Sequence, residues 1–154
     1  MVAMRKPGND TSIEPASQRD YGDVVALLET ATLPAEDLEP DSMADFLAAR
    51  NEAGELIGAI CAERFGRTAL LRSLVVAPGF RSRGVGGQLL DELEGRCRAS
   101  GITDLFLLTT SARAFFTGRN YWAIERDAVP AALRATAEFT RLCPDTAVCM
   151  TKCL

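Results

Sequence analysis

The chain has 154 residues, of which 47% are hydrophobic and 25% are charged, and its formal net charge is −4. This balance is typical of a globular protein with one full core, and the negative charge argues against a general nucleic-acid binder. Because the apolar runs are too short to cross a bilayer and no signal peptide opens the chain, we expect a cytoplasmic protein that does not bind membranes.

The residues before position 46 predict a tail, a strand, a helix and a loop. Ser17 with Asp20 resembles the capping box that begins a helix, and the apolar residues that follow have helical spacing. The predicted loop carries two prolines and four acidic residues. In chain order these elements are expected at residues 1–11, 12–16, 21–31 and 33–41.

Three strands are predicted next, at residues 46–50, 55–64 and 68–77. Asn51–Gly54 and Gly66–Arg67 have the composition of tight turns, so these strands should be antiparallel neighbours. The sheet is therefore expected to begin with an antiparallel part.

The second half of the chain predicts a helix at 84–99 and a continuous apolar strand at 104–109. The helix has apolar residues four apart and a glycine at its end. The strand has the composition of a buried, parallel neighbour. Ser111 is expected to cap a short helix through Arg119, which ends at Asn120. Final strands are expected at residues 121–124 and 147–153.

Residues 70–90 are the most informative part of the sequence. An apolar strand ends before Pro78, an arginine-bearing loop follows, and a helix begins at once. A helix N-terminus presents unpaired N–H groups and a partial positive charge, which bind phosphate. Glycines let an anion approach the main chain, and arginines add positive charge beside it. The residues with these two roles are Gly84, Gly86, Gly87, Arg81 and Arg83. An ordinary glycine-rich turn is the alternative.

The spacing of these residues distinguishes between known phosphate loops. The chain has no Gly-x-x-x-x-Gly-Lys followed by Ser or Thr, and Leu89 stands where a dinucleotide fingerprint needs its third glycine. The pattern that is present is Arg-x-x-Gly-x-Gly, filled by Arg81, Gly84 and Gly86. It resembles the acyl-CoA-binding loop of the GCN5-related N-acetyltransferases.

The resemblance implies a fold and a cosubstrate. The fold is of the α/β (α+β) class, with a mixed sheet of about six to seven strands flanked by about four helices, here as one domain over residues 12–154. The cosubstrate is acetyl-CoA, whose pyrophosphate would lie on the loop and whose pantetheine would run along residues 74–76. The implied cofactor-binding residues are Leu74, Val75, Val76, Arg81, Ser82, Arg83, Gly84, Val85, Gly86, Gly87, Thr109, Ala112, Phe115 and Phe116.

A second stretch resembles the family pattern Ala-x-x-Phe-Tyr-x-x-x-Gly-Phe, with Ala112, Phe115, Phe116, Asn120 and Tyr121 at its fixed places. Phe116 stands where the family commonly has the Tyr that protonates the departing thiolate. A thiol has a pKa near 8.5, so this loss need not abolish catalysis. Tyr121 is a possible substitute acid, and a backbone N–H around Val76 would stabilise the oxyanion.

The general base is expected to be a carboxylate, because the chain contains no histidine. Glu63 is the first choice, since it lies within a strand of an otherwise apolar sheet. Arg72 and Ser73 on the next strand are expected to bind substrate. The alternative is that Glu63 and Arg72 only pair with each other. The acidic residues at 36–39 either attract a cationic amine or form a solvated loop.

The five cysteines, an odd number, are typical of a reducing compartment. Their spacing does not match a zinc site, so we expect no metal and interpret them as small buried hydrophobic residues. They lie at positions 61, 97, 143, 149 and 153.

The C-terminal third is similar to the acetyltransferases encoded with arsenic-resistance genes. This resemblance implies an N-acetyltransferase that acts on the amine of a small molecule by direct attack, with a role in arsenic resistance. The alternatives are a peptide or protein amine as acceptor, or a CoA-binding sensor without turnover. Arsenite binding by the cysteines and a homodimer paired through the last strands are further hypotheses. The residues that carry the resemblance are Phe115, Phe116, Tyr121, Arg126, Pro130, 135–139, 142–144 and 150–154.

Overall fold

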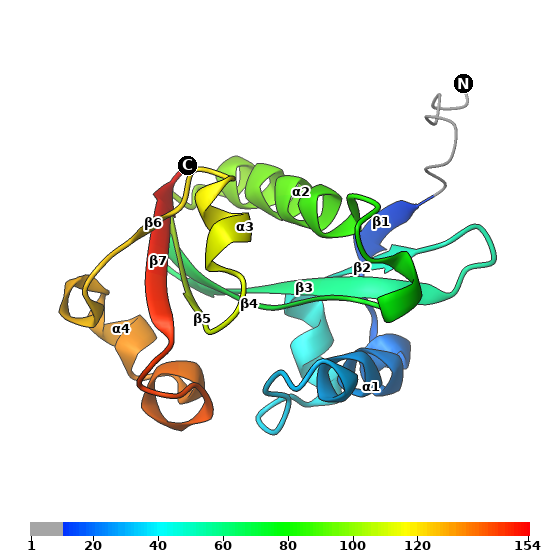
Figure 1. Ribbon diagram of the computed structural model, residues 1–154, viewed down its shortest axis with the longest axis horizontal. Coiled ribbons are helices and arrows are strands. Elements are labelled where there is room, and N and C mark those ends of the chain that lie inside the picture. Colours follow the sequence, from blue (N-terminus) through cyan, green and yellow to red (C-terminus); the bar gives the residue numbers. More distant parts are fainter. Residues whose placement is uncertain (1–10) are drawn as a thin grey trace.

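A seven-stranded mixed sheet forms the centre of the protein, in the order β1-β2-β3-β4-β5-β7-β6 (Figure 1). The computed structural model describes residues 11–154, so the predicted tail lies outside the described residues except for Thr11. The predicted fold class is confirmed. The strands are β1 Ser12–Pro15, β2 Phe46–Arg50, β3 Leu56–Phe65, β4 Thr68–Val76, β5 Asp104–Thr109, β6 Trp122–Ala123 and β7 Val148–Cys153.

Helices cover both faces of this sheet, with α2 on one face and α1 and α4 on the other (Figure 1). The apolar stripe of α2 packs against β1 to β4, and the buried side of α1 packs against β3 and β4. None of the helices within residues 11–154 is both long and apolar enough to span a membrane. The helices are α1 Tyr21–Thr30, α2 Val85–Ala99, α3 Arg113–Thr117 and α4 Ala131–Arg134.

Shorter helical turns connect these elements. The capping box predicted at Ser17 and Asp20 is present and begins the turn that leads into α1. The turns are η1 Gln18–Asp20, η2 Pro40–Asp45, η3 Pro78–Phe80, η4 Arg126–Ala128 and the π-helical turn η5 Glu138–Leu142. The helical elements from residue 126 onward, η4, α4 and η5, were not predicted from the sequence.

Strand β4 carries a bulge in its middle. Cys61 of β3 pairs with Arg72, whereas Ala59 pairs with Val75, so β4 has one extra residue between these pairs. Ser73 has a φ of 60°, in the left-handed region. A bulge of this kind bends the strand and redirects its side chains.

Strands β4 and β5 are parallel neighbours, as predicted, but they pair over only three residues each. Their ladder runs from Thr68 and Asp104 to Leu70 and Phe106, while β5 continues to pair with β7 as far as Thr109. The second half of β4 therefore separates from β5. Beyond Leu70, β4 has no strand partner on the β5 side among residues 11–154.

Two local predictions are wrong. Ser111 does not cap α3, because the helix begins at Arg113 and Ala112 occupies the capping position, where its N–H donates to the hydroxyl of Thr109 at 2.9 Å. The helix also ends at Thr117, before the expected Arg119, although Asn120 has the expected positive φ of 70°.

The cysteines do not all share one environment. Cys61, Cys97 and Cys149 are buried, as expected for small hydrophobic residues. Cys153 is exposed and Cys143 is half-buried, so the prediction is wrong for Cys153.

Candidate functional site

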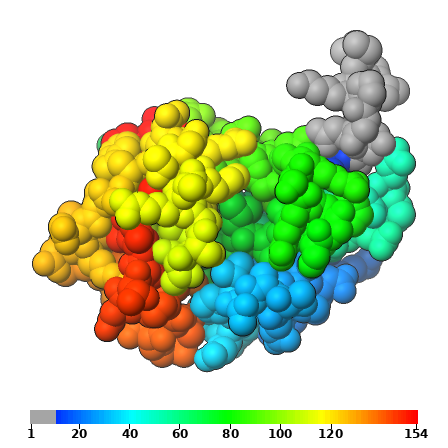
Figure 2. All heavy atoms as spheres, in the orientation of Figure 1, coloured from blue at the N-terminus to red at the C-terminus, as the bar shows by residue number. Residues whose placement is uncertain are grey.

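A cavity of about 520 Å³ lies between the diverging halves of β4 and β5. Its walls are residues 71–76 of β4, residues 107–112 at the end of β5, and the beginning of α2 and α3. Residues 31–34 after α1 and parts of the segment 138–147 close its other end. In the space-filling view, the blue chain after α1, the green loop before α2 and the yellow chain after β5 meet near the middle of the visible face (Figure 2).

One end of the cavity lies at the N-terminus of α2. Gly84 occupies the capping position with a φ of +83°, a conformation that favours glycine. The Nε group of Arg81 donates to the carbonyl of Val76 at 3.0 Å, which holds the guanidinium at the end of β4. Arg81 and Gly86 both line the cavity. The helix terminus and the arginine make this end attractive to an anion.

Gly87 lies against the side chain of Arg119. A Cβ atom at this position would collide with the guanidinium of Arg119. Arg119 donates to the carbonyl of Gly87 at 3.3 Å and to Asp91 at 2.8 Å. The absence of a side chain at Gly87 thus leaves room for the end of the Arg119 side chain.

The structure brings nine of the fourteen expected cofactor-binding residues into the wall of this cavity. The aromatic part of the wall is Phe115 and Phe116. Their rings pack edge to face, with the ring centroids 5.2 Å apart. The residues that line the cavity are Leu74, Val75, Val76, Arg81, Gly86, Thr109, Ala112, Phe115 and Phe116. Ser82, Arg83, Gly84, Val85 and Gly87 belong to the adjoining loop and first helical turn without lining it.

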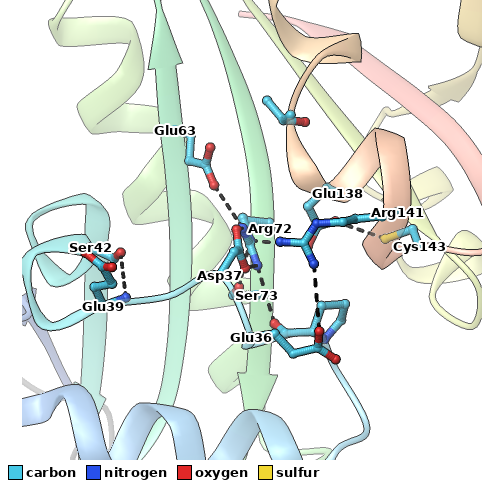
Figure 3. A network of polar contacts seen from close by, with 12 residues as sticks. Glu36, Asp37, Glu39, Ser42, Glu63, Arg72, Ser73, Glu138, Arg141 and Cys143 are labelled. Carbon is cyan, nitrogen blue, oxygen red and sulfur yellow. Dashed lines mark hydrogen bonds and ion pairs between the residues drawn. The ribbon is translucent and has the colours of Figure 1, made fainter.

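The other end of the cavity holds a buried arginine with three carboxylates (Figure 3). The side chain of Arg72 is 1% exposed. It donates to both oxygens of Asp37, at 2.6 and 2.9 Å, and to Glu63 at 3.0 Å. Its Nε lies 3.2 Å from Glu138 and 3.2 Å from the hydroxyl of Ser73. We call Arg72, Asp37, Glu63 and Glu138 the arginine cluster.

Glu63 pairs with Arg72, as in the predicted alternative. The two do not pair only with each other, because Asp37 and Glu138 also bind Arg72. Glu63 and Asp37 line a separate hollow of about 400 Å³, whereas Arg72, Ser73 and Glu138 line the main cavity. The structure does not bring the Glu63 carboxylate into the cavity where a reaction would occur.

Glu138 is the residue that the sequence analysis did not select as a candidate. It is 5% exposed and comes from η5, a segment for which no element was predicted. The only local signal was a single acidic residue between Ala137 and Phe139. Its position beside Arg72 depends on contacts between residues 66 positions apart, which no local pattern reveals.

The carboxylates of the arginine cluster differ in acidity. Burial raises the pKa of Glu138, and the attraction of Arg72 opposes this effect without cancelling it. Burial also acts on Asp37, but its two bonds from Arg72 prevail and hold the pKa of Asp37 below its ordinary value. Glu138 is thus the more basic of the two.

Two further contacts involve η5 and the residues next to it. The Cys143 thiol donates to Glu138 at 3.1 Å, and burial raises the pKa of this thiol to about 12. Arg141 lies 3.8 Å from Glu36, which joins η5 to the loop after α1 (Figure 3). The thiol is therefore a hydrogen-bond donor and not a thiolate at neutral pH. Among residues 11–154, no group of three or more His, Cys, Asp or Glu side chains is placed to hold a metal ion.

Tyr121 does not line the cavity. It is 2% exposed, and its hydroxyl donates to Glu94 of α2 at 2.7 Å. Lys152 of β7 binds the same carboxylate at 2.9 and 3.1 Å. Burial and the Glu94 carboxylate raise the pKa of Tyr121. This position does not suit the role of a substitute acid, and the three residues instead join α2 to β7.

We expect Tyr121→Phe to lower the free energy of unfolding by about 1–2 kcal/mol, because a buried carboxylate loses one of its donors. Urea titrations of the variant and the parent measure this difference. Tyr21→Phe is the matched control: its hydroxyl donates to the carbonyl of Leu38 in a partly buried position, so a smaller loss is expected. Equal stability of Tyr121→Phe and the parent protein would contradict this structural role.

Comparisons with known proteins agree on one family. The model of the family described as "Acetyltransferase (GNAT) family" matches residues 12–121. An amino-acid acetyltransferase of Pseudomonas syringae pv. tomato is 38% identical over 71 residues, and that of Azotobacter vinelandii is 35% identical over 71 residues. Each match covers 46% of this chain and 16% of the relative, so the chain spans about a sixth of the length of these relatives.

Solved structures show the same fold. N-acetylglutamate synthase from Neisseria gonorrhoeae, complexed with coenzyme A and N-acetyl-glutamate, superposes with a TM-score of 0.81 at 22% identity, over 94% of this chain and 35% of that one. A GNAT-family acetyltransferase from Staphylococcus aureus Mu50 superposes with a TM-score of 0.73 at 18% identity, over 94% of this chain and 99% of that one.

Proposed function

This chain belongs to the GNAT family of acetyltransferases, and from that membership we propose that it transfers the acetyl group of acetyl-CoA to the amine of a small molecule. The observation that carries the proposal is the single cavity between β4 and β5. It joins an anion-attracting helix N-terminus at one end to the arginine cluster at the other. This arrangement suits a long donor with a diphosphate and an acceptor that meets its acyl end.

The residues at the start of α2 fit a diphosphate. The first N–H groups of a helix have no partner within the helix, so they are free to bind phosphate oxygens. Gly86 leaves room beside them, since a Cβ there would come no closer than 3.8 Å to the side chains of Val76 and Phe115. Arg81 would add a full positive charge.

The edge of β4 fits the pantetheine arm. This arm carries two amide groups, and residues 71–76 line the cavity beyond the point where β4 pairs with β5. Backbone groups on this edge can therefore bond to the amides as a neighbouring strand would. A backbone N–H around Val76 would stabilise the oxyanion.

Direct attack by the amine is the proposed reaction, without a covalent enzyme intermediate. Phe116 cannot protonate the leaving thiolate, and Tyr121 lies outside the cavity. Because a thiol has a pKa of about 8.5, the thiolate can leave without an acid at neutral pH.

Two lines support a small acceptor with amino-acid character. The curated relatives are amino-acid acetyltransferases, although the chain matches only a sixth of their length. The similarity to acetyltransferases of arsenic resistance supports arsenic-bearing analogues of amino acids as the first special class to test.

We also propose a cytoplasmic homodimer. An odd number of cysteines suits a reducing compartment, and Trp122, 48% exposed on the edge strand β6, suits a dimer contact.

Thiol release from acetyl-CoA, measured with a panel of amines, tests the proposed function. The panel contains amino acids, their arsenic-bearing analogues, simple amines and short peptides. We expect release that depends on a small amine of the amino-acid class. Preferential turnover of peptides would instead support a peptide acetyltransferase, and binding of coenzyme A without turnover of any amine would support a sensor.

A further inference from the structure

One acidic residue of the arginine cluster, Glu138, lines the main cavity. Glu138 is 5% exposed, so it is largely shielded from bulk solvent while it borders the cavity. Arg72 and the Cys143 thiol hold it on two sides, at 3.2 and 3.1 Å. A buried acidic group fixed by two donors has a defined position, as a catalytic group needs.

We propose that Glu138 is the general base that takes the proton from the ammonium group of the acceptor, and that Arg72 and Cys143 are the residues that position it. This proposal rests on the function proposed above and assigns one of its steps to a residue.

The step balances as follows. The ammonium nitrogen gives a proton to the Glu138 carboxylate, directly or through one water, and keeps its electron pair. That pair forms the C–N bond to the thioester carbonyl carbon. The C–S bond breaks and its electron pair leaves with the thiolate, which takes a proton from solvent. Glu138 then returns its proton to water.

Geometry favours Glu138 over the other carboxylates of the cluster. Asp37 and Glu63 line the separate hollow, and each holds Arg72 through at least one hydrogen bond. Asp37 is also a weaker base, since its pKa lies below the ordinary value. A base works best when its pKa is near the working pH, and burial moves the pKa of Glu138 in that direction.

The charged and titratable groups around Glu138 come from several elements. Arg72 of β4 favours the ionised carboxylate, as does the Cys143 thiol after η5. Asp37, from the loop after α1, and Glu63 of β3 disfavour it. Arg141 on η5 itself pairs with Glu36. The net result is a carboxyl group that becomes ionised at a higher pH than an exposed glutamate.

This result fixes the sign of the pH dependence. The rate should rise with pH as Glu138 loses its proton, at a pKa above the ordinary glutamate value, and then reach a plateau. The decisive variant is Glu138→Gln, because an amide still accepts a hydrogen bond from Arg72 but cannot take a proton.

We expect Glu138→Gln to lower kcat by about 100- to 1,000-fold, which is the usual contribution of a general base. Its rate should lose the plateau and keep rising with pH until the acceptor amine itself is deprotonated. Glu138→Asp should recover part of kcat and restore the plateau. The KM for acetyl-CoA and the thermal midpoint of Glu138→Gln should stay close to the parent values.

Two further variants make the comparison specific. Glu63→Gln replaces a different carboxylate that binds Arg72. We expect this variant to keep the acid limb of the pH profile, which is the rise of the rate with pH below the plateau. Glu92→Gln, an exposed residue on α2 paired with Arg96, controls for the loss of one negative charge. If Glu138→Gln does not fold, the pH profile of Glu138→Asp is measured in its place. Its shorter carboxylate should keep the acid limb of the profile but lower kcat.

A Glu138→Gln enzyme with the parent's plateau and a kcat within about threefold of the parent would overturn the proposal. Loss of the acid limb in Glu63→Gln instead would also overturn it. Both results presuppose turnover by the parent protein. A parent protein without turnover would contradict the proposed function and not this assignment alone, so the two failures are distinguishable.

Discussion

Replacing Arg72 with methionine is expected to lower the free energy of unfolding by about 3–5 kcal/mol at neutral pH, which is the usual cost of removing one partner from a buried ion pair. Arg72 is 1% exposed and lies among Asp37, Glu63 and Glu138. Methionine fills a similar volume but leaves three carboxylates close together without a cation. Urea titrations near pH 7 measure the loss.

The loss should depend on pH in a defined direction. The Arg72 bonds lower the pKa of Asp37, so their stabilising contribution is present above the ordinary aspartate pKa and is lost as the pH falls through the lowered value. In Arg72→Met the crowded carboxylates bind protons more readily than in the parent, so the difference between the two proteins should shrink near about pH 4.

Arg72→Lys is the matched control. It keeps the charge and loses the two-pronged bond to Asp37, so we expect a smaller loss of about 1–2 kcal/mol. If Arg72→Met and the parent differ by the same amount at both pH values, then Arg72 acts through packing and not through its charge.

Replacing Gly86 with aspartate should weaken the binding of coenzyme A by at least about 100-fold, since like charges brought together at a binding surface cost several kcal/mol. Gly86 lies in the first turn of α2 and lines the cavity. A carboxylate there would repel a diphosphate and occupy its space. Isothermal titration of coenzyme A into the parent and the variant measures the effect.

Gly86→Ala separates charge from space. Its Cβ would meet Val76 and Phe115 only at ordinary contact distances of 3.8 and 3.9 Å. Alanine should also be the better helix former, so the variant should fold and lose at most about tenfold in affinity. Equal losses in the two variants would show that bulk alone matters at this position, and no loss in either would place the diphosphate elsewhere.

The strand, loop and helix of residues 70–99 and most other strands could be predicted because their signals are local. Tight turns at Asn51–Gly54 and Gly66–Arg67 fix the antiparallel part of the sheet. The helix at residues 85–99 follows from apolar residues four apart and a glycine at each end. Such patterns depend on neighbours within a few positions, which the sequence displays directly.

The complete arginine cluster could not be predicted, because its residues come from four separate segments. Glu63 and Arg72 were recognised as unusual charges on strands, and they do pair. Their spacing could not reveal that Asp37 and Glu138 join them, 35 and 66 positions from Arg72. The same limit explains Tyr121: its place in the motif gave no sign that its hydroxyl donates to Glu94, which Lys152 also binds, within the core beside α2.

Gly87 shows a further difference between pattern and structure. Three glycines near a helix N-terminus suggest one shared role, yet the space at Gly87 is filled by Arg119, bound to Asp91 one turn further along α2. A glycine pattern identifies close approaches to the backbone without identifying the approaching group.

A crystal structure of the protein with coenzyme A would decide the central claim most directly. Our account predicts density for the two bridging phosphates against the first amides of α2, beside Arg81 and Gly86, with the thiol chain continuing between β4 and β5 toward Glu138. Coenzyme A bound on another face, with this cavity filled only by solvent, would contradict it.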